Sequence, residues 1–348
     1  MKLHLLLWSI YRKMNQYTNN EEINHRIDSF FNDSRARSCA YEKGIVTIIL
    51  IGSLARGEGT WKILGEKSTL VSDVEFWIVH NGSIDFGSIR KKMQELSSLY
   101  SSKFASHTFH VDFDFIHEKK ISHMEKKLIV YEAKESGKII YGINCIKQLP
   151  NISVKNINLI DIKDILIHRL FSVLYYGNKI TDKDSDEYSY LLSKNILDFM
   201  TVIAVQNGVL ASGFAQRFRI LKENHFCDDL IPLFEHCMNI KFNDSKYSRH
   251  QYNNAFLYDE LFNIAQILNK SFKYNPRNLL INLFYVIRRL FGILKRQIVY
   301  KHFFHCNYFK RLLSYKEKCL NRDILLDNLV RNGFPSISDI NQIYPIKE

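Results

Sequence analysis

The sequence contains few of the residues that mark linkers, and it lacks the long apolar runs of membrane proteins. Only 14 Gly and 5 Pro occur in 348 residues, and no Gly-rich or Pro-rich run separates one region from the next. No stretch reaches the roughly 18 consecutive apolar residues that a membrane-spanning helix requires. The apolar start MKLHLLLWSIYRK is not followed by a small-residue cleavage site, which favours a packed helix over a signal peptide. We therefore expect a soluble or peripheral protein.

Cysteine pairs of the kind that bind metals or form disulfide frameworks are also lacking. The 6 Cys are scattered, and none belongs to a C-x-x-C pair. Scattered cysteines are typical of reduced thiols in a cytoplasmic protein. His225, Cys227, His236 and Cys237 lie close together in sequence, but their spacing matches no common zinc pattern. We therefore expect free thiols and a cytoplasmic location.

Acidic residues are scarce toward the C-terminal end. The formal net charge is +12, and between residues 288 and 322 ten Lys and Arg accompany a single acid. Arg288 and Arg289 recur seven residues later as Lys295 and Arg296, which indicates one basic helix face. Such a patch suits nucleic acid, an anionic membrane surface or a phosphorylated substrate, and charge does not choose among them. Peripheral membrane contact through these basic C-terminal helices and a core helix with a solvated basic edge both stay open.

The chain is too long for one small domain, and its two halves show different patterns. In the first half, helical spacing of apolar residues predicts helices, and β-branched or alternating runs predict strands. The predicted strands are 45–51, 72–79, 109–116 and the short KIIYG at 138–142, and the predicted helices are about 23–31, 89–100 and 126–136. We therefore predict an N-terminal domain of sheet and helices over residues 1–148.

After Pro150 the pattern becomes helical throughout. Apolar residues recur at i, i+3 and i+4 in the stretches 162–176, 188–210, 228–238, 255–268 and 278–304. No convincing strand interrupts them. We predict an all-helical domain over residues 149–348, so that the fold class of the whole chain is α+β.

Carboxylates occupy alternate positions in two of the predicted strands. Side chains alternate between the two faces of a strand, so Asp73 and Glu75 share one face, and His110, Asp112 and Asp114 share another. If the two strands are neighbours, three or four carboxylates converge on one patch of the sheet, where without a partner their pKa values would rise. Mg²⁺ resolves this conflict, since it prefers carboxylate oxygens and keeps positions for water and phosphate.

A Gly-Ser turn follows the first strand, in the stretch IGSLARGEG at 51–59. Gly52 allows a close approach of the backbone, and we expect a helix after Ser53 whose amide N–H groups point toward an anion. Arg56 in that first turn adds a positive charge. Carboxylates that bind a metal beside a phosphate-binding turn indicate phosphoryl or nucleotidyl transfer.

In this order, Gly52-Ser53, Asp73-Val74-Glu75 and Asp112 resemble the signature of the nucleotidyltransferase superfamily. That superfamily includes DNA polymerase β, the aminoglycoside nucleotidyltransferases and the minimal nucleotidyltransferases, and GSLARGE is especially similar to the last two groups. The resemblance covers about residues 20–145. It implies a mixed sheet with flanking helices, two Mg²⁺ ions held by the catalytic carboxylates Asp73, Glu75 and Asp112, and a nucleoside triphosphate as substrate.

The resemblance has departures and open alternatives. Nineteen residues separate Ser53 from Asp73, so WKILGEKSTLV is interpreted as an insertion at the rim of the site. Asp112 fits the third acidic position best, but Asp114 shares its face and stays an alternative. The superfamily often uses a Lys on a helix of the second domain to contact the triphosphate. Lys194 in LLSKNILDF is the candidate, and an ordinary solvated lysine is the alternative.

The resemblance implies transfer of a nucleoside monophosphate to an acceptor hydroxyl, with release of pyrophosphate. Ser53, Arg56 and Lys194 would bind the β- and γ-phosphates, with Gly52 in the turn. We expect a small-molecule acceptor such as a sugar or sugar phosphate. Modification of RNA or protein by a toxin–antitoxin or defence enzyme, and a non-catalytic nucleotide-binding module, are the alternatives.

Overall fold

The computed structural model describes residues 16–32, 42–64, 67–104, 111–157, 159–177, 180–242 and 252–274. The chain divides into two compact units. One unit comprises Met1–Ile157 and Ala204–Gln251, and the other comprises Asn158–Ile203 and Tyr252–Glu348. The domain boundary at residues 148 and 149 stays a prediction. His110, the N-terminal helix and the basic helices between residues 278 and 322 lie outside the described residues.

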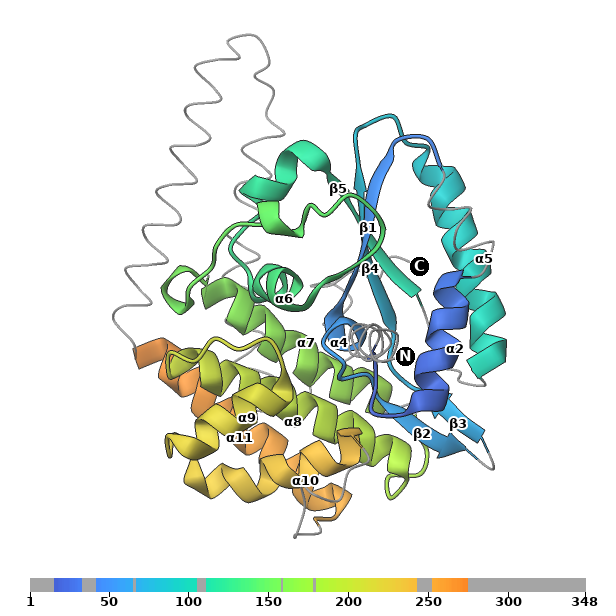
Figure 1. The fold of residues 1–348 in the computed structure, drawn as a ribbon. Coiled ribbons are helices and arrows are strands. Elements are labelled where there is room, and N and C mark those ends of the chain that lie inside the picture. Colours follow the sequence, from blue (N-terminus) through green and yellow to red (C-terminus); the bar gives the residue numbers. More distant parts are fainter. Residues whose placement is uncertain are drawn as a thin grey trace, which may run out of the picture. The chain divides into compact units, whose positions relative to one another are not determined.

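A four-stranded mixed sheet runs through the first unit (Figure 1). Its strands, in the order β5-β4-β1-β6, are β5 (Val111–His117), β4 (Val74–His80), β1 (Ile45–Ile51) and β6 (Lys138–Gly142). β1 pairs antiparallel with β4 and with β6, whereas β4 and β5 run parallel. The four predicted strands therefore form one sheet, and the predicted mixed α+β class is confirmed.

Helices cover both faces of this sheet (Figure 1). They are α2 (Glu21–Asn32) and α5 (Phe86–Phe104) on one face and α6 (Leu128–Ser136) on the other. β1 is apolar on both sides, because Ile48 and Leu50 pack toward α2 and α5, whereas Ile49 and Ile51 pack toward α6. Full burial of such a side chain contributes about 1.5–3 kcal/mol, so these two cores fix the orientation of the sheet.

The long spacer after the Gly-Ser turn folds into a separate hairpin. Its strands are β2 (Trp61–Leu64) and β3 (Lys67–Leu70). Thr60 and Ser72 close its base, because the Thr60 amide N–H donates to Ser72 Oγ at 2.7 Å and the Ser72 amide N–H donates to the Thr60 carbonyl at 3.2 Å. The chain therefore leaves and returns at one place, and the interpretation as an insertion at the rim of the site stays a prediction.

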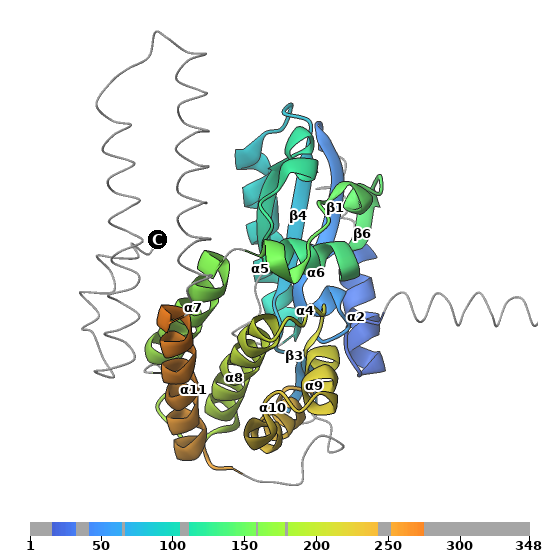
Figure 2. The same ribbon diagram turned by 90° about the vertical axis from the view of Figure 1, so that its left-hand side faces the viewer.

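Two further helices belong to the first unit, although they come from the predicted helical half. They are α9 (Phe214–Glu223) and α10 (Ile231–Phe242), which pack side by side (Figure 2). The sequence predicts a helix near α10 but none at α9. The buried face of α9 carries Phe214, Phe218 and Leu221 at helical spacing, together with the buried cation of Arg217.

Helices make up the described part of the second unit. They are α7 (Leu159–Gly177), the greater part of α8 (Asp186–Gln206) and α11 (Asn254–Tyr274), which confirms the helices predicted for these stretches. An ion pair between Arg169 Nε and Asp198 Oδ2, at 2.6 Å, joins α7 to α8. None of the described helices combines the length and the apolar character that crossing a membrane requires.

Candidate nucleotide-binding site

The Gly-Ser turn lies directly against Glu75. Gly52 has a φ of +72°, in the left-handed region that favours glycine. A β-carbon at this position would overlap Oε2 of Glu75, so the carboxylate occupies the space that only a glycine leaves empty. The sheet register brings the two strands together here, since Ile51 of β1 is the partner of Glu75 in β4. The predicted turn and one predicted carboxylate are thus neighbours.

The helix expected after Ser53 is a single turn, α4 (Gly52–Ala55). A four-residue helix has only a small dipole, because the macrodipole arises from many aligned peptide units. The expected helix is therefore present as one turn, and the contact of its amide N–H groups with an anion stays a prediction. What the turn offers is the Ser53 hydroxyl and a close backbone approach at Gly52.

The acidic residues of β4 and β5 lie in register. Glu75 and Asp112 are partners in the parallel pairing, while Asp114 pairs with the buried Trp77 two positions along. Asp112 and Asp114 are both exposed, and Phe113 between them packs into the core on the opposite face. This arrangement confirms that β4 and β5 are neighbours and that the acids share one face.

The predicted metal ligands do not form a closed cage. Asp73 immediately precedes β4, and Glu75 and Asp112 lie on neighbouring strands. Within the part of the chain that the structure describes, no group of three or more His, Cys, Asp or Glu side chains is placed to hold a metal ion. Mg²⁺, however, is usually bound through one or two carboxylates together with substrate phosphates. The all-oxygen donor set therefore fits a magnesium ion that binds with the nucleotide.

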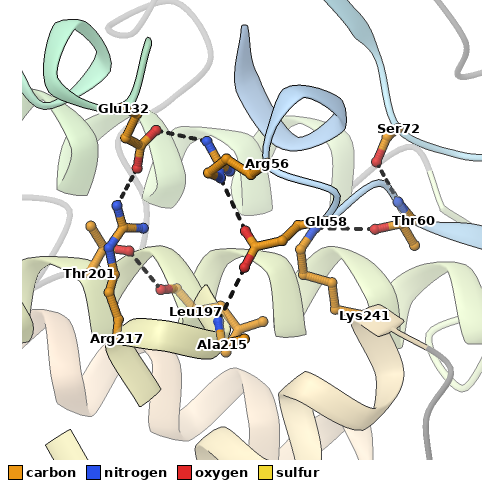
Figure 3. Close-up of polar contacts among 10 residues, drawn as sticks. All are labelled: Arg56, Glu58, Thr60, Ser72, Glu132, Leu197, Thr201, Ala215, Arg217 and Lys241. Carbon is orange, nitrogen blue, oxygen red and sulfur yellow. Dashed lines mark hydrogen bonds and ion pairs between the residues drawn. The ribbon is translucent and has the colours of Figure 1, made fainter. Parts of the chain in front are cut away.

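Arg56 lies between two carboxylates (Figure 3). Its Nε donates to Glu58 Oε2 at 3.1 Å and its Nη1 to Glu132 Oε2 at 2.8 Å, and its side chain is only 10% exposed. Burial alone would lower the pKa of Arg56, but Glu132, Glu58 and, more weakly, Glu75 offset this effect and raise the pKa. The guanidinium therefore remains charged. Its predicted contact with phosphate stays a prediction.

The carboxylates beside Arg56 have second partners that the sequence does not predict (Figure 3). Glu132 also accepts a hydrogen bond from Nη2 of Arg217, whose side chain is 2% exposed. Glu58 Oε1 accepts a hydrogen bond from the backbone N–H of Ala215, in the first turn of α9, at 3.1 Å. These second partners lie 85 and 157 positions away in the sequence, so local patterns carry no signal for them.

A buried lysine contacts the base of the hairpin. Lys241 of α10 is 2% exposed, and its Nζ donates to Thr60 Oγ1 at 3.1 Å. The same ammonium lies 5.3 Å from the ring centroid of Phe214. Thr60 is in turn hydrogen-bonded to Ser72, the residue before Asp73, so Lys241 is linked through Thr60 to the start of β4. A residue of α10 therefore holds the base of the hairpin that joins the Gly-Ser turn to Asp73.

Lys194 lies on α8 in the second unit, where it is partly buried. The turn and the carboxylates belong to the first unit. Its predicted contact with the triphosphate stays a prediction.

No protein-family model and no curated protein matches the chain. Among solved structures, the spectinomycin adenyltransferase AAD(9) from Enterococcus faecialis, solved with ATP and spectinomycin, is similar at a TM-score of 0.41 and 14% identity. The match covers 71% of this chain and 99% of the other. A likeness at this TM-score is distant, and no activity follows from it.

Proposed function

We propose that this protein is a nucleotidyltransferase, which moves a nucleoside monophosphate from a nucleoside triphosphate to a hydroxyl of a small acceptor molecule. The observation that carries the proposal is the contact of Gly52 with Glu75, whose register partner is Asp112. One small region therefore offers close backbone approach for phosphates and carboxylate oxygens for a cation. Nucleotidyl transfer needs both features at one place.

Asp73, Glu75 and Asp112 would hold the two Mg²⁺ ions that the superfamily resemblance implies. When bound, such ions neutralise the charge of the triphosphate and lower the pKa of an acceptor hydroxyl. Because the carboxylates come from two neighbouring strands, they can share cations with the phosphates of a bound nucleotide. We therefore expect metal and nucleotide to bind together.

In the proposed reaction the acceptor oxygen forms a bond to the α-phosphorus. The bond from that phosphorus to the oxygen that bridges to the β-phosphate breaks, and pyrophosphate leaves with the electron pair. Asp112 takes the proton of the acceptor hydroxyl, a role that its exposed side chain permits. Ser53 donates its hydroxyl hydrogen to a phosphate oxygen, and Lys194 neutralises charge on the leaving pyrophosphate.

We propose a small-molecule acceptor such as a sugar or sugar phosphate. The support is the similarity of GSLARGE to the corresponding stretch of the minimal and aminoglycoside-type enzymes. The protein's share of the reaction is then to position two small molecules and to stabilise developing charge.

The test is label transfer by the purified protein. The protein is incubated with Mg²⁺, each α-labelled nucleoside triphosphate in turn, and three acceptor pools: small metabolites, RNA and protein from a cell extract. Pyrophosphate release and labelled product are measured for wild type, Asp73→Asn and Glu95→Gln, an exposed acid on α5 away from the site.

Label that moves to a small molecule with wild type and Glu95→Gln, but not with Asp73→Asn, would support the proposal. Label on RNA or protein would overturn the small-molecule acceptor but would still support nucleotidyl transfer. Absence of turnover by the folded wild-type protein with every triphosphate and pool would overturn the proposal.

A further inference from the structure

Four charged side chains form one ion-pair network in the first unit (Figure 3). Arg56 and Arg217 alternate with Glu58 and Glu132, so two positive and two negative charges balance. Each of the four side chains is 14% exposed or less. A buried charge is costly unless a partner of opposite charge lies beside it, so each member of this network depends on the others.

The network leaves Arg56 little freedom to turn. Its Nε and Nη1 donate to carboxylates on two different segments, and each carboxylate uses its second oxygen for another donor. A guanidinium is a rigid planar fork, so rotation toward a new anion would break both bonds together. The arrangement is that of an arginine held in place from two sides.

The loop that carries Arg56 is bonded back to the Gly-Ser turn. The Arg56 backbone N–H donates to the Gly52 carbonyl at 3.3 Å, and the Glu58 N–H donates to the Ser53 carbonyl at 2.8 Å. Gly52 in turn is in contact with Glu75. A displacement of Arg56 or Glu58 therefore moves the turn, and the turn moves relative to the carboxylate.

Glycine at position 213 leaves room for the side chain of Glu58, which attaches this loop to α9. A β-carbon there would lie 2.6 Å from Oε1 of Glu58, closer than real contacts allow. Without that side chain, Glu58 reaches the backbone N–H of Ala215 in the first turn of α9. A carboxylate is stabilised at a helix N-terminus, where backbone N–H groups have no helical partner.

We propose that Glu58, Glu132 and Arg217 are positioning residues, which together with Arg56 hold the Gly-Ser turn against Glu75. In this assignment Arg56 helps to hold the Gly-Ser turn in place and does not bind the phosphates of the nucleotide. The inference rests on the proposed function for its kinetic consequences, but the restraint of the turn is a property of the protein alone.

The test compares wild type with Glu132→Gln, Arg217→Met and Arg217→Lys. Glu135→Gln is the matched control, because Glu135 is an exposed glutamate on the same helix, α6. Two measurements are made on the folded proteins. One is amide hydrogen exchange over residues 52–58, and the other is kcat and KM for the nucleoside triphosphate.

Exchange over residues 52–58 should be faster in Glu132→Gln and Arg217→Met than in wild type, Arg217→Lys and Glu135→Gln. Turnover should fall by up to the order of a hundredfold in kcat, since small misplacements of a reacting group have effects of that size. KM should stay the same or rise, because a displaced Gly-Ser turn cannot bind the phosphates better than the wild-type turn does. Arg217→Lys should retain most of the rate, since it restores the charge.

Unchanged exchange in both Glu132→Gln and Arg217→Met would overturn the positioning role, whether or not the wild type turns over. A lower KM in Glu132→Gln would also overturn it, because release of Arg56 would then improve phosphate binding. If wild type shows no turnover but the exchange pattern is as expected, the proposed function fails and the network stands.

Discussion

Oε2 of Glu75 occupies the position that a β-carbon of residue 52 would take. Two residues that lie 23 positions apart are therefore fitted to each other, a left-handed glycine in a turn and a carboxylate on the neighbouring strand. The contact joins the phosphate-binding half of the proposed site to its metal-binding half. Each of the following predictions tests this region or its supports.

Gly52→Ala should abolish nucleotide binding but leave the protein folded. Alanine at a positive φ costs roughly 1–2 kcal/mol, and its β-carbon displaces the flexible end of Glu75. Gly208→Ala is the matched control, because Gly208 has a φ of +81° with nothing within 4 Å of the added carbon. Urea unfolding should show a similar loss for both variants. Calorimetric titration with nucleotide and Mg²⁺ should show lost binding for Gly52→Ala alone, and equal binding would contradict the fit described here.

Asp112→Asn should reduce the rate of label transfer far more than Asp114→Asn. Asp112 is the register partner of Glu75, whereas Asp114 lies two residues further along β5, or about 6.6 Å at the rise of a strand. Loss of a general base typically costs on the order of a hundredfold or more, so we expect at least that for Asp112→Asn and less than about threefold for Asp114→Asn. Single-turnover rates of both variants decide the point. The reverse order would identify Asp114 as the third carboxylate.

Ser72→Ala should destabilise the protein through the base of the hairpin. The change removes the acceptor of the Thr60 N–H in a buried place. A buried donor left without a partner costs about 1–3 kcal/mol, so the free energy of unfolding in urea should fall by that amount. Ser122→Ala, at an exposed position, is the control and should change little. Equal stabilities would mean that the Thr60–Ser72 contact does not fix the hairpin.

Lys138 should make stability depend on pH in the alkaline range. Burial lowers its pKa to about 8, and Asp28 only partly opposes this shift. Between pH 8 and the ordinary lysine pKa of about 10.4, the unfolded chain holds a proton that the folded protein has lost, so stability from this group rises with pH.

The measurement for Lys138 is the difference in free energy of unfolding between wild type and Lys138→Gln from pH 7 to 10. A difference is required, because burial raises the pKa values of Cys227 and Tyr131, which lowers stability as pH rises over the same range. We expect the wild type to gain on the variant above pH 8. A constant difference would contradict the shifted pKa of Lys138.

The sheet and the faces of its strands could be predicted from sequence, because burial imposes patterns that repeat locally. β6 forms at the predicted KIIYG, and the alternation in VDFDFI places Phe113 in the core and Asp112 outside it. The parallel pairing of β4 with β5 brings Glu75 and Asp112 into register, as the acidic pattern requires.

The supports of the site could not be predicted in the same way. Glu132 and Arg217 look like solvated charges in sequence. They form their ion pairs only because α6 places Glu132 beside Arg56 and α9 places Arg217 beside Glu132. The helix α9 itself had a usable signal, because Phe214, Phe218 and Leu221 recur at helical spacing, whereas the burial of Arg217 beside them had none. Such partners are far apart in the chain, and a single sequence records no pairing between them.

The measurement that tests the central claim most directly is calorimetric titration of each nucleoside triphosphate into the protein, with and without Mg²⁺. Wild type and Glu75→Gln are compared. The account predicts that wild type binds at least one triphosphate in a magnesium-dependent manner and that Glu75→Gln loses this dependence. Magnesium-dependent binding of equal strength in Glu75→Gln, or no binding by the folded wild type, would contradict a nucleotide site at the contact of Gly52 with Glu75.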